Sequence, residues 1–208
     1  MPLIAVIMCG GKGIRLRKLA PLEKPLLKLQ GETMIERVAY ALVMSKRFER
    51  IVGVTSPNTP KTHRLLSSKL NGIISLMKAA GKSYSEDLSS VLNNLRPATV
   101  FVVSADLPLL SADVLKYVLT IYRSYVTPCT SVIADKKFVI ALGIKPSVVI
   151  RINSKEYCHT SISIIKSTLV KDLKYLKEHY IIVNKKELVV NVNTEAELKV
   201  AENWLSRI

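Results

Sequence analysis

Short apolar runs alternate with segments of helical periodicity through the first half of the chain. Strands are expected at 3–8, 50–56, 72–77 and 98–108. Helices are expected at 34–44, 58–70, 83–95 and 111–125. Because consecutive parallel strands need a crossover connection, usually a helix, this alternation predicts a mostly parallel sheet with helices on both faces. The expected fold class is therefore α/β, with a doubly wound, Rossmann-like sheet.

The second half of the chain breaks this alternation. Residues 129–144 resemble two strands joined by a tight turn, which would add an antiparallel element to the sheet. The remaining expectations are a basic region at 151–186 with a helix near 171–179, a strand at 187–192 and an amphipathic helix at 194–208. No linker, repeat or low-complexity segment interrupts this order, so one domain spanning 1–208 is expected.

Composition limits the classes of protein that fit the chain. No apolar run in its 208 residues approaches the ~18 needed to span a membrane, and the N-terminal segment lacks the features of a secretory leader. Cys9, Cys129 and Cys158 share no spacing typical of a disulfide framework or a metal site, which favours a reduced, cytoplasmic location. The net charge of +15 suggests a polyanionic partner, either nucleic acid or a phosphate-rich small molecule.

The first expected strand leads into a loop that is rich in glycine and positive charge. Its glycines are Gly10, Gly11 and Gly13, and its cations include Lys12, Arg15 and Lys24. The loop is not a P-loop, because no Gly-Lys pair is followed by Ser or Thr at the required spacing. It is not a dinucleotide fingerprint either, because Leu16 stands where the third glycine belongs. Bare backbone N–H groups and cations at the carboxyl end of a strand predict a phosphate site.

Polar clusters also follow the next three expected strands. Ser56 and Asn58 follow the second strand, Glu86 and Asp87 follow the third, and Asp106 follows the fourth. A lone aspartate fits a magnesium ion that is held largely by substrate phosphates. Two of the clusters also have a purely structural interpretation, because Asn58 stands where a helix begins and the helix dipole favours acids in a first turn.

The ordered set of motifs resembles the MobA-like nucleotidyltransferase family. The matching stretches are GGKGIR at 10–15, EKP at 23–25 and ADLP at 105–108. The stretches TSPNTPKT at 55–62, GKSYSEDL at 81–88 and NVNTEAEL at 191–198 are similar to the archaeal GTP:adenosylcobinamide-phosphate guanylyltransferases of cobamide synthesis. The resemblance implies a fold of the nucleotide-diphospho-sugar transferase type. It also implies GTP as donor, adenosylcobinamide phosphate as acceptor, pyrophosphate as product and Mg²⁺ as cofactor.

The resemblance further implies roles for individual residues. The expected catalytic residues are Arg15, Lys24 and Asp106. The expected nucleotide-binding residues are Met8, Cys9, Gly10, Gly11, Lys12, Gly13, Ser56, Asn58, Glu86 and Asp87. Gly143 is expected to contact the acceptor, and Asp106 and Asn193 are expected to hold the metal ion. The chain departs from the family pattern at Lys78 and Lys145, where relatives carry an acidic residue and an asparagine, respectively.

The acceptor chemistry agrees with the residues present. A phosphate monoester has a second pKa of about 6 and is largely ionised at neutral pH, so its transfer reaction needs no general base. Two alternatives stay open: another nucleotidyltransferase of this fold, such as a molybdopterin guanylyltransferase, and a basic nucleic-acid-binding protein. Aromatic residues make up only 6% of the chain and no nucleic-acid module is recognisable, which makes nucleic acid the weaker partner. A homodimer is left open, and no membrane partner is expected.

Overall fold

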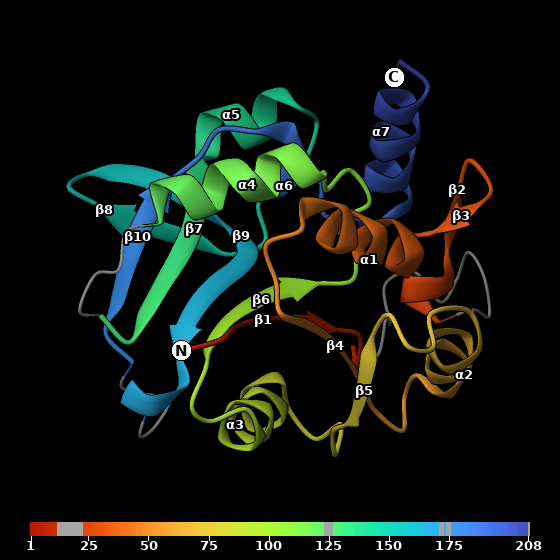
Figure 1. The fold of residues 1–208 in the computed structure, drawn as a ribbon. Coiled ribbons are helices and arrows are strands. Elements are labelled where there is room, and N and C mark those ends of the chain that lie inside the picture. The colour runs from red at the N-terminus through yellow and green to blue at the C-terminus, as the bar shows by residue number, and fades with distance from the viewer. Residues whose placement is uncertain (12–22, 123–126, 171–172, 174–175, 208) are drawn as a thin grey trace.

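The computed structural model describes residues 1–11, 23–122, 127–170, 173 and 176–207. An eight-stranded mixed sheet lies at its centre (Figure 1). The strands are β1 (Leu3–Met8), β4 (Arg50–Thr55), β5 (Ser75–Lys78), β6 (Thr99–Ser104), β7 (Cys129–Asp135), β8 (Val149–Ile152), β9 (Lys155–Lys166) and β10 (Glu178–Ile182). Their order is β10-β7-β9-β6-β1-β4-β5, with β8 paired to β9. A separate ribbon pairs β2 (Lys28–Leu29) with β3 (Glu32–Thr33).

The predicted parallel half of the sheet is confirmed. Strand β1 pairs in parallel with β4 on one side and β6 on the other, and β4 pairs in parallel with β5. Residues Ile4 to Ile7 of β1 are buried, which explains the uninterrupted apolar run of a strand covered on both faces. The strand expected at 72–77 begins only at Ser75, because a turn precedes it with Gly72 at a φ of +77°.

The antiparallel element predicted for the C-terminal half is also present. Strand β9 lies between β6 and β7 and runs antiparallel to both. Strand β8 forms a hairpin with β9, and β10 pairs in parallel with β7 at the edge of the sheet. The fold is therefore a mixed α/β sheet, mostly parallel, with antiparallel strands in its C-terminal half.

Two local expectations in this half are wrong. The residues after β7 form helix α5 (Lys136–Ala141), because Val139, Phe138 and Leu142 pack on the core at helical spacing. The antiparallel partner of β7 is instead β9. The strand expected at 187–192 is replaced by the short helix α6 (Lys186–Val189), whose Leu188 and Val189 are buried in the core.

The helix expected near 171–179 falls partly on residues outside the described part of the chain. Strand β10 begins at Glu178, so the end of that segment is extended. The chain's final helix, α7 (Glu195–Leu205), is confirmed.

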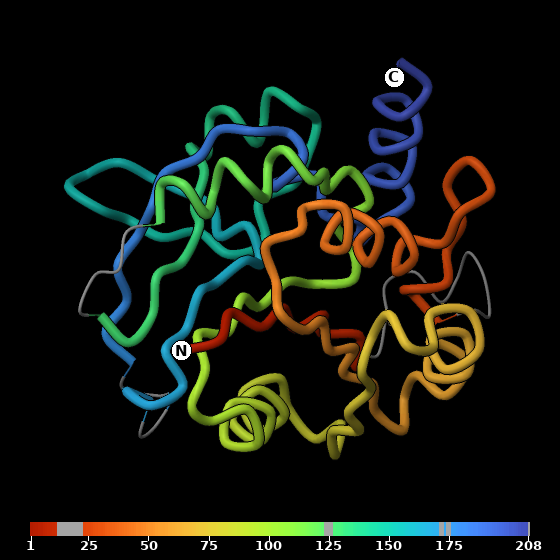
Figure 2. The backbone as a smooth tube through the Cα atoms, in the orientation of Figure 1, coloured from red at the N-terminus to blue at the C-terminus, as the bar shows by residue number. Residues whose placement is uncertain are grey.

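Helices cover both faces of the sheet, as a doubly wound fold requires. Within the described residues the other helices are α1 (Met34–Ser45), α2 (Pro60–Lys69), α3 (Tyr84–Asn94), α4 (Ala112–Ile121) and the 3-10 turns η2 (Lys24–Leu26) and η3 (Ser167–Leu169). Helix α3 packs on one face, below the sheet in Figure 1, while α1, α2 and α4 contribute to the larger core on the other face. The backbone trace in Figure 2 ends in α7, which contacts the β2–β3 ribbon.

Side chains at the helix starts explain where several of these helices begin. Thr33 and Glu36 form a capping box at α1, with hydrogen bonds in both directions. Ser83 caps α3 by accepting a hydrogen bond from the backbone of Glu86, and Thr194 caps α7 in the same way. Among the described residues, none of the helices is long and apolar enough to span a bilayer.

Candidate active site

The carboxyl ends of β1, β4 and β6 lie side by side, so the polar loops that follow them meet at one edge of the sheet. Met8 at the end of β1 is paired with Val54 of β4 and with Ser104 of β6. A cavity of about 410 Å³ opens beyond these ends. Its lining residues are Met8, Gly10, Gly11, Asn58, Gly81, Lys82, Ser83, Tyr84, Asp87 and Ser104. The volume falls within the usual range for small-molecule sites, and the position is that expected for ligands of this fold class.

Two glycines allow the loops around this cavity to approach each other closely. A Cβ atom on Gly10 would lie 3.2 Å from both Cβ and Oγ of Ser56, and the Ser56 hydroxyl donates a hydrogen bond to the Gly10 carbonyl at 3.1 Å. Gly81 has a φ of +73°, and a Cβ atom there would lie 3.1 Å from the side-chain nitrogen Nδ2 of Asn58. The Asp87 carboxylate accepts a hydrogen bond from the Gly81 backbone at 3.0 Å. These contacts fix the shape of the cavity wall.

Gly11 differs from its neighbour, because a Cβ there would meet nothing within 4 Å among the described residues. It lines the cavity at an exposed position. Packing against the described part of the chain therefore does not require a glycine at 11.

A second group of polar residues comes from three distant parts of the chain. The Lys24 ammonium forms an ion pair with Asp106 and donates a hydrogen bond to Asn193 Oδ1 at 2.8 Å. The side chains of Lys24 and Asp106 are only 14% and 11% exposed. Asp106 Oδ1 is buried and has no hydrogen-bond partner among the described residues. A buried, unpartnered carboxylate oxygen is uncommon in proteins and indicates a missing cation or donor.

The backbone brings Asp106 and Asn193 together independently of their side chains. The Val192 N–H donates to the Asp106 carbonyl at 3.0 Å, which ties the segment before α7 to the loop after β6. Glu197, which is 4% exposed, accepts a hydrogen bond from the Asn193 N–H at 2.7 Å. Asn193 is therefore held at the N-terminus of α7 by contacts on both sides.

Glu23, which directly precedes Lys24, contacts α2 and was not among the site residues expected from the sequence. The Glu23 carboxylate accepts hydrogen bonds from the backbone N–H groups of Lys61 and Thr62, at 2.7 and 2.6 Å, and from the Thr62 hydroxyl at 2.6 Å. It thereby caps α2, whose N-cap residue Thr59 makes no side-chain cap of its own. The signal available in the sequence was the helix start at Pro60, which lacks an acid in its first turn.

The residues at this edge suit a metal ion that is also bound by substrate. No group of three or more histidine, cysteine or acidic side chains within the described residues could hold a metal ion by itself. One aspartate with an unpartnered oxygen and one amide oxygen supply two of the six ligands that Mg²⁺ takes, and phosphate oxygens usually supply others. Asp106 and Asn193 therefore fit the group that the sequence predicts.

The other predicted nucleotide-binding residues differ in how they face the cavity. Cys9 is turned into the core, where burial raises the pKa of its thiol above the ordinary value, so only its backbone can face a ligand. Asp87 lines the cavity, whereas Glu86 is exposed and not among the lining residues. Ser56 acts on the glycine loop through its bond to Gly10. Lys12, Gly13 and Arg15 lie outside the described residues.

Gly143, the predicted acceptor contact, follows α5. It has a φ of +77°, and its N–H donates to the Ile140 carbonyl at 2.9 Å. This left-handed conformation after a helix is a sufficient reason for a glycine. A contact between Gly143 and an acceptor stays a prediction.

Known proteins of similar sequence cover most of this chain. The model of the MobA-like NTP transferase domain matches residues 5–168. An adenosylcobinamide-phosphate guanylyltransferase from Methanocaldococcus jannaschii is 32% identical over 211 residues, covering 98% of this chain and 97% of that protein. The matched region includes the glycine loop, Lys24 and Asp106.

Solved structures share the fold at much lower sequence identity. A putative glucose-1-phosphate thymidylyltransferase from Bacillus anthracis superimposes with a TM-score of 0.72 at 14% identity, covering 99% of this chain and 96% of that one. A 4-diphosphocytidyl-2C-methyl-D-erythritol synthase from Anaerococcus prevotii gives 0.69 at 14% identity, covering 99% and 96%. Both likenesses concern the fold alone. Together with the match over residues 5–168, they agree with the sheet described above, and the chain belongs to the MobA-like NTP transferase family.

Proposed function

We propose that this protein is a guanylyltransferase that moves GMP from GTP to adenosylcobinamide phosphate and releases pyrophosphate. The observation that carries the proposal is the cluster of Lys24, Asp106 and Asn193. It lies beside a nucleotide-sized cavity at the edge of the sheet where β1, β4 and β6 end. The name of the 32% identical relative supplies the donor and the acceptor. Because that likeness runs over nearly the whole of both chains, it supports the complete reaction rather than a shared module.

In this reaction an oxygen of the acceptor phosphate attacks the α-phosphorus of GTP. The new bond joins two phosphoryl groups, the bond from the α-phosphorus to the bridging oxygen breaks, and pyrophosphate leaves with the bond's electron pair. The attacking and leaving groups are both anionic, so catalysis depends on positioning and on cancelling charge. Lys24 is the described cation closest to Asp106, and its ammonium suits the growing charge on the leaving pyrophosphate.

The metal ion expected here is Mg²⁺, which Asp106 and Asn193 would hold together with phosphate oxygens of GTP. When bound, it neutralises charge on the triphosphate and stabilises the departing pyrophosphate. The base and ribose of GTP would then lie in the 410 Å³ cavity, between the Gly81 turn and the end of β1. Asp87 and Asn58 are two of the side chains there that can form hydrogen bonds with the edge of a base.

A coupled pyrophosphate assay tests the proposal. The purified protein is supplied with each of the four nucleoside triphosphates, with and without Mg²⁺, and with three acceptors in turn: adenosylcobinamide phosphate, molybdopterin and a sugar 1-phosphate. The proposal predicts Mg²⁺-dependent release of pyrophosphate with GTP and adenosylcobinamide phosphate only. Turnover with molybdopterin would instead assign the protein to a different branch of the same chemistry, and no turnover with any pair would refute the enzymatic role.

A further inference from the structure

The side-chain amide of Asn193 has two chemically different ends, and the structure shows which one faces Lys24, the ion-pair partner of Asp106. Asn193 Oδ1 accepts the hydrogen bond from Lys24 at 2.8 Å. Asn193 Nδ2 donates to Asn191 Oδ1 at 2.6 Å and lies 3.5 Å from the Asn191 carbonyl oxygen. Reversing this amide would turn its N–H donors towards the ammonium of Lys24 and would leave no oxygen to ligate a cation.

Asn191 is itself held from the far side. Its Nδ2 donates to Ser161 Oγ at 3.2 Å, and the Ser161 N–H donates to His159 Nδ1 at 2.9 Å. Burial lowers the pKa of His159, which favours the neutral imidazole that accepts this bond. A continuous chain of hydrogen bonds therefore runs from Lys24 through the two asparagines to β9.

Ser161 occupies an unusual position in β9. Its backbone φ is +63°, a conformation that residues other than glycine rarely adopt. The register between β9 and β7 shifts at this point, since Ser131 pairs with Ser163 but Ile133 pairs with His159. A left-handed serine is strained and persists only where its surroundings hold it, and such strain is concentrated at functional sites.

We infer that Asn191 is a positioning residue that fixes the amide of Asn193 with its oxygen towards Asp106, so that the cation site is formed before GTP arrives. This inference rests on the proposed function, because it assigns a role in forming the metal site of the same reaction. Asn191 does not touch the substrate in this scheme. It acts through Asn193, as partners behind a metal ligand commonly do.

An asparagine at 191 meets both requirements of the network. Its oxygen accepts from Asn193, and its nitrogen donates to Ser161. An aspartate keeps the first contact, and the Ser161 hydroxyl can then donate to it instead of accepting. A leucine of similar size removes both contacts and allows the Asn193 amide to turn over.

The test compares Asn191→Leu with Asn191→Asp by a readout that does not require turnover. Mn²⁺ is titrated into the protein saturated with GTP in the absence of acceptor, and free Mn²⁺ is measured by electron paramagnetic resonance. We expect Asn191→Leu to weaken Mn²⁺ binding by about 10- to 100-fold. Asn191→Asp should bind Mn²⁺ at least as tightly as the wild type. Asn94→Leu, which removes an exposed asparagine amide on α3, is the matched control and should behave as the wild type.

Each outcome has a definite meaning. Wild-type affinity in Asn191→Leu, or equal weakening in Asn191→Leu and Asn191→Asp, would refute the positioning role while leaving the proposed function intact. If the wild type shows no GTP-dependent Mn²⁺ binding, the proposed function and this inference both fail. Melting curves are recorded for every variant, and Asn191→Ala replaces Asn191→Leu if the latter does not fold.

Discussion

At the scale of single residues, the candidate site shows features that stability alone does not explain. Asp106 is buried with one oxygen paired to Lys24 and the other unpartnered among the described residues. Such an oxygen costs free energy in the isolated protein, because it has lost water without gaining a partner. A cation that binds there recovers this cost. The residue is therefore better suited to binding than to holding the fold together.

Replacing Asp106 by asparagine tests this reading. Asp106→Asn keeps the shape of the side chain but removes its charge, so we expect turnover to fall by about 10²–10³-fold. Lys24 retains its hydrogen bond to Asn193, so the melting temperature should change by only a few degrees. Pyrophosphate release and a thermal melt measure the two effects. Full Mg²⁺-dependent turnover in this variant would remove Asp106 from the site.

Neighbouring glycines in the loop after β1 should respond differently to the same substitution. Gly10→Ala places a methyl group 3.2 Å from Ser56, so the loop must move away from the cavity and KM for GTP should rise. Gly11→Ala meets no described atom within 4 Å and should be mild. Gly11→Asp adds a negative charge facing the phosphates and should be severe, whereas the uncharged Gly11→Asn should not. Steady-state kinetics with GTP measure all four variants, and equal effects of Asp and Asn at 11 would refute the phosphate assignment.

At the scale of helices and strands, the first half of the chain could be predicted well and the second half only in outline. Strands β1, β4 and β6 alternate with helices whose starts carry recognisable signals, such as Ser83 before α3. The residues that form α5 and α6 were predicted as strands, because a short apolar run fits a strand and a single helical turn equally well. Tertiary packing on the core decides between them.

The candidate site could likewise be predicted from the sequence only in part. Placing Gly10, Asp87 and Asp106 at one edge required only the rule that parallel strands end together. The approach of Lys24 to Asn193 joins residues 169 positions apart, and no periodicity predicts such a contact. The resemblance to a family suggested both residues, but the amide network behind Asn193 could be seen only in the structure.

The cap that Glu23 provides to α2 should affect both stability and catalysis. Glu23→Ala removes acceptors for two backbone N–H groups, so we expect a loss of about 1–2 kcal/mol of unfolding free energy. Turnover should also fall, because Glu23 immediately precedes Lys24. Urea unfolding and the pyrophosphate assay measure these effects. Glu32→Ala, which breaks a half-exposed pair with Arg37, is the control and should change neither by much. Unchanged turnover in a destabilised Glu23→Ala would restrict Glu23 to a structural role.

The capping box of α1 predicts a dependence of stability on pH. Burial raises the pKa of Glu36, but hydrogen bonds from Thr33 and the ion pair with Lys69 outweigh it and hold the pKa below its ordinary value of 4.5. The unfolded chain therefore binds this proton more readily, and the stability that Glu36 contributes is present above that value and lost as the pH falls below it. Glu36→Gln should unfold at lower urea than the wild type at pH 7. The difference in urea midpoint between wild type and Glu36→Gln should narrow as the pH falls below 4.5. A difference that stays constant with pH would contradict this role of the Glu36 carboxylate.

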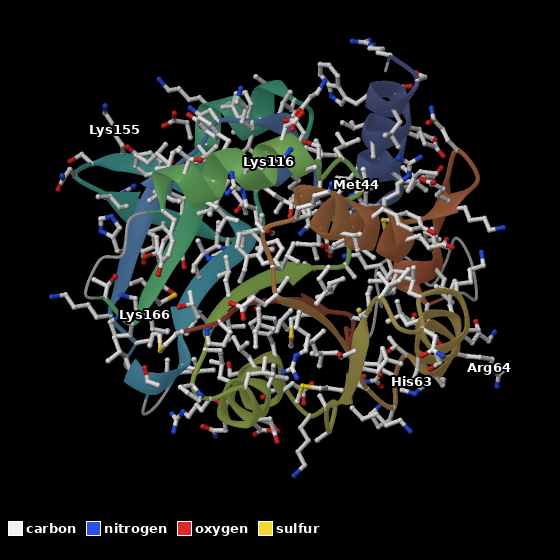
Figure 3. The ribbon with its side chains drawn as sticks, in the orientation of Figure 1. Met44, His63, Arg64, Lys116, Lys155 and Lys166 are labelled. Atoms are coloured by element: carbon white, nitrogen blue, oxygen red, sulfur yellow. The ribbon has the colours of Figure 1, made fainter. Side chains whose placement is uncertain are left out.

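At the scale of the whole molecule, the net charge is +15, and the basic side chains of the described residues are spread over several elements. The basic side chains labelled in Figure 3 include Arg64 on α2, Lys116 on α4 and Lys155 at the start of β9, which lie on well-separated elements. Several cations are paired, among them Lys69 with Glu36 and Lys136 with Glu156. A diffuse positive potential of this kind attracts anions generally and speeds their approach, but it does not distinguish one nucleotide sequence from another.

This distribution leads to a prediction that separates the enzymatic proposal from nucleic-acid binding. We expect single-stranded RNA to bind weakly at low salt and to lose at least 10-fold in affinity between about 50 mM and about 200 mM salt, since the contacts are mainly with phosphates. The proposed GTP site is a partly enclosed cavity, so turnover of GTP with adenosylcobinamide phosphate should fall much less over the same range. Fluorescence anisotropy with labelled RNA and the pyrophosphate assay are run in the same buffers, with excess RNA added to the assay at the higher salt as a competition control. RNA binding that persists at high salt in a protein that turns over no GTP would favour a nucleic-acid-binding protein. Salt-sensitive RNA binding together with steady GTP turnover would support the guanylyltransferase and would leave RNA binding as a non-specific effect of the positive charge.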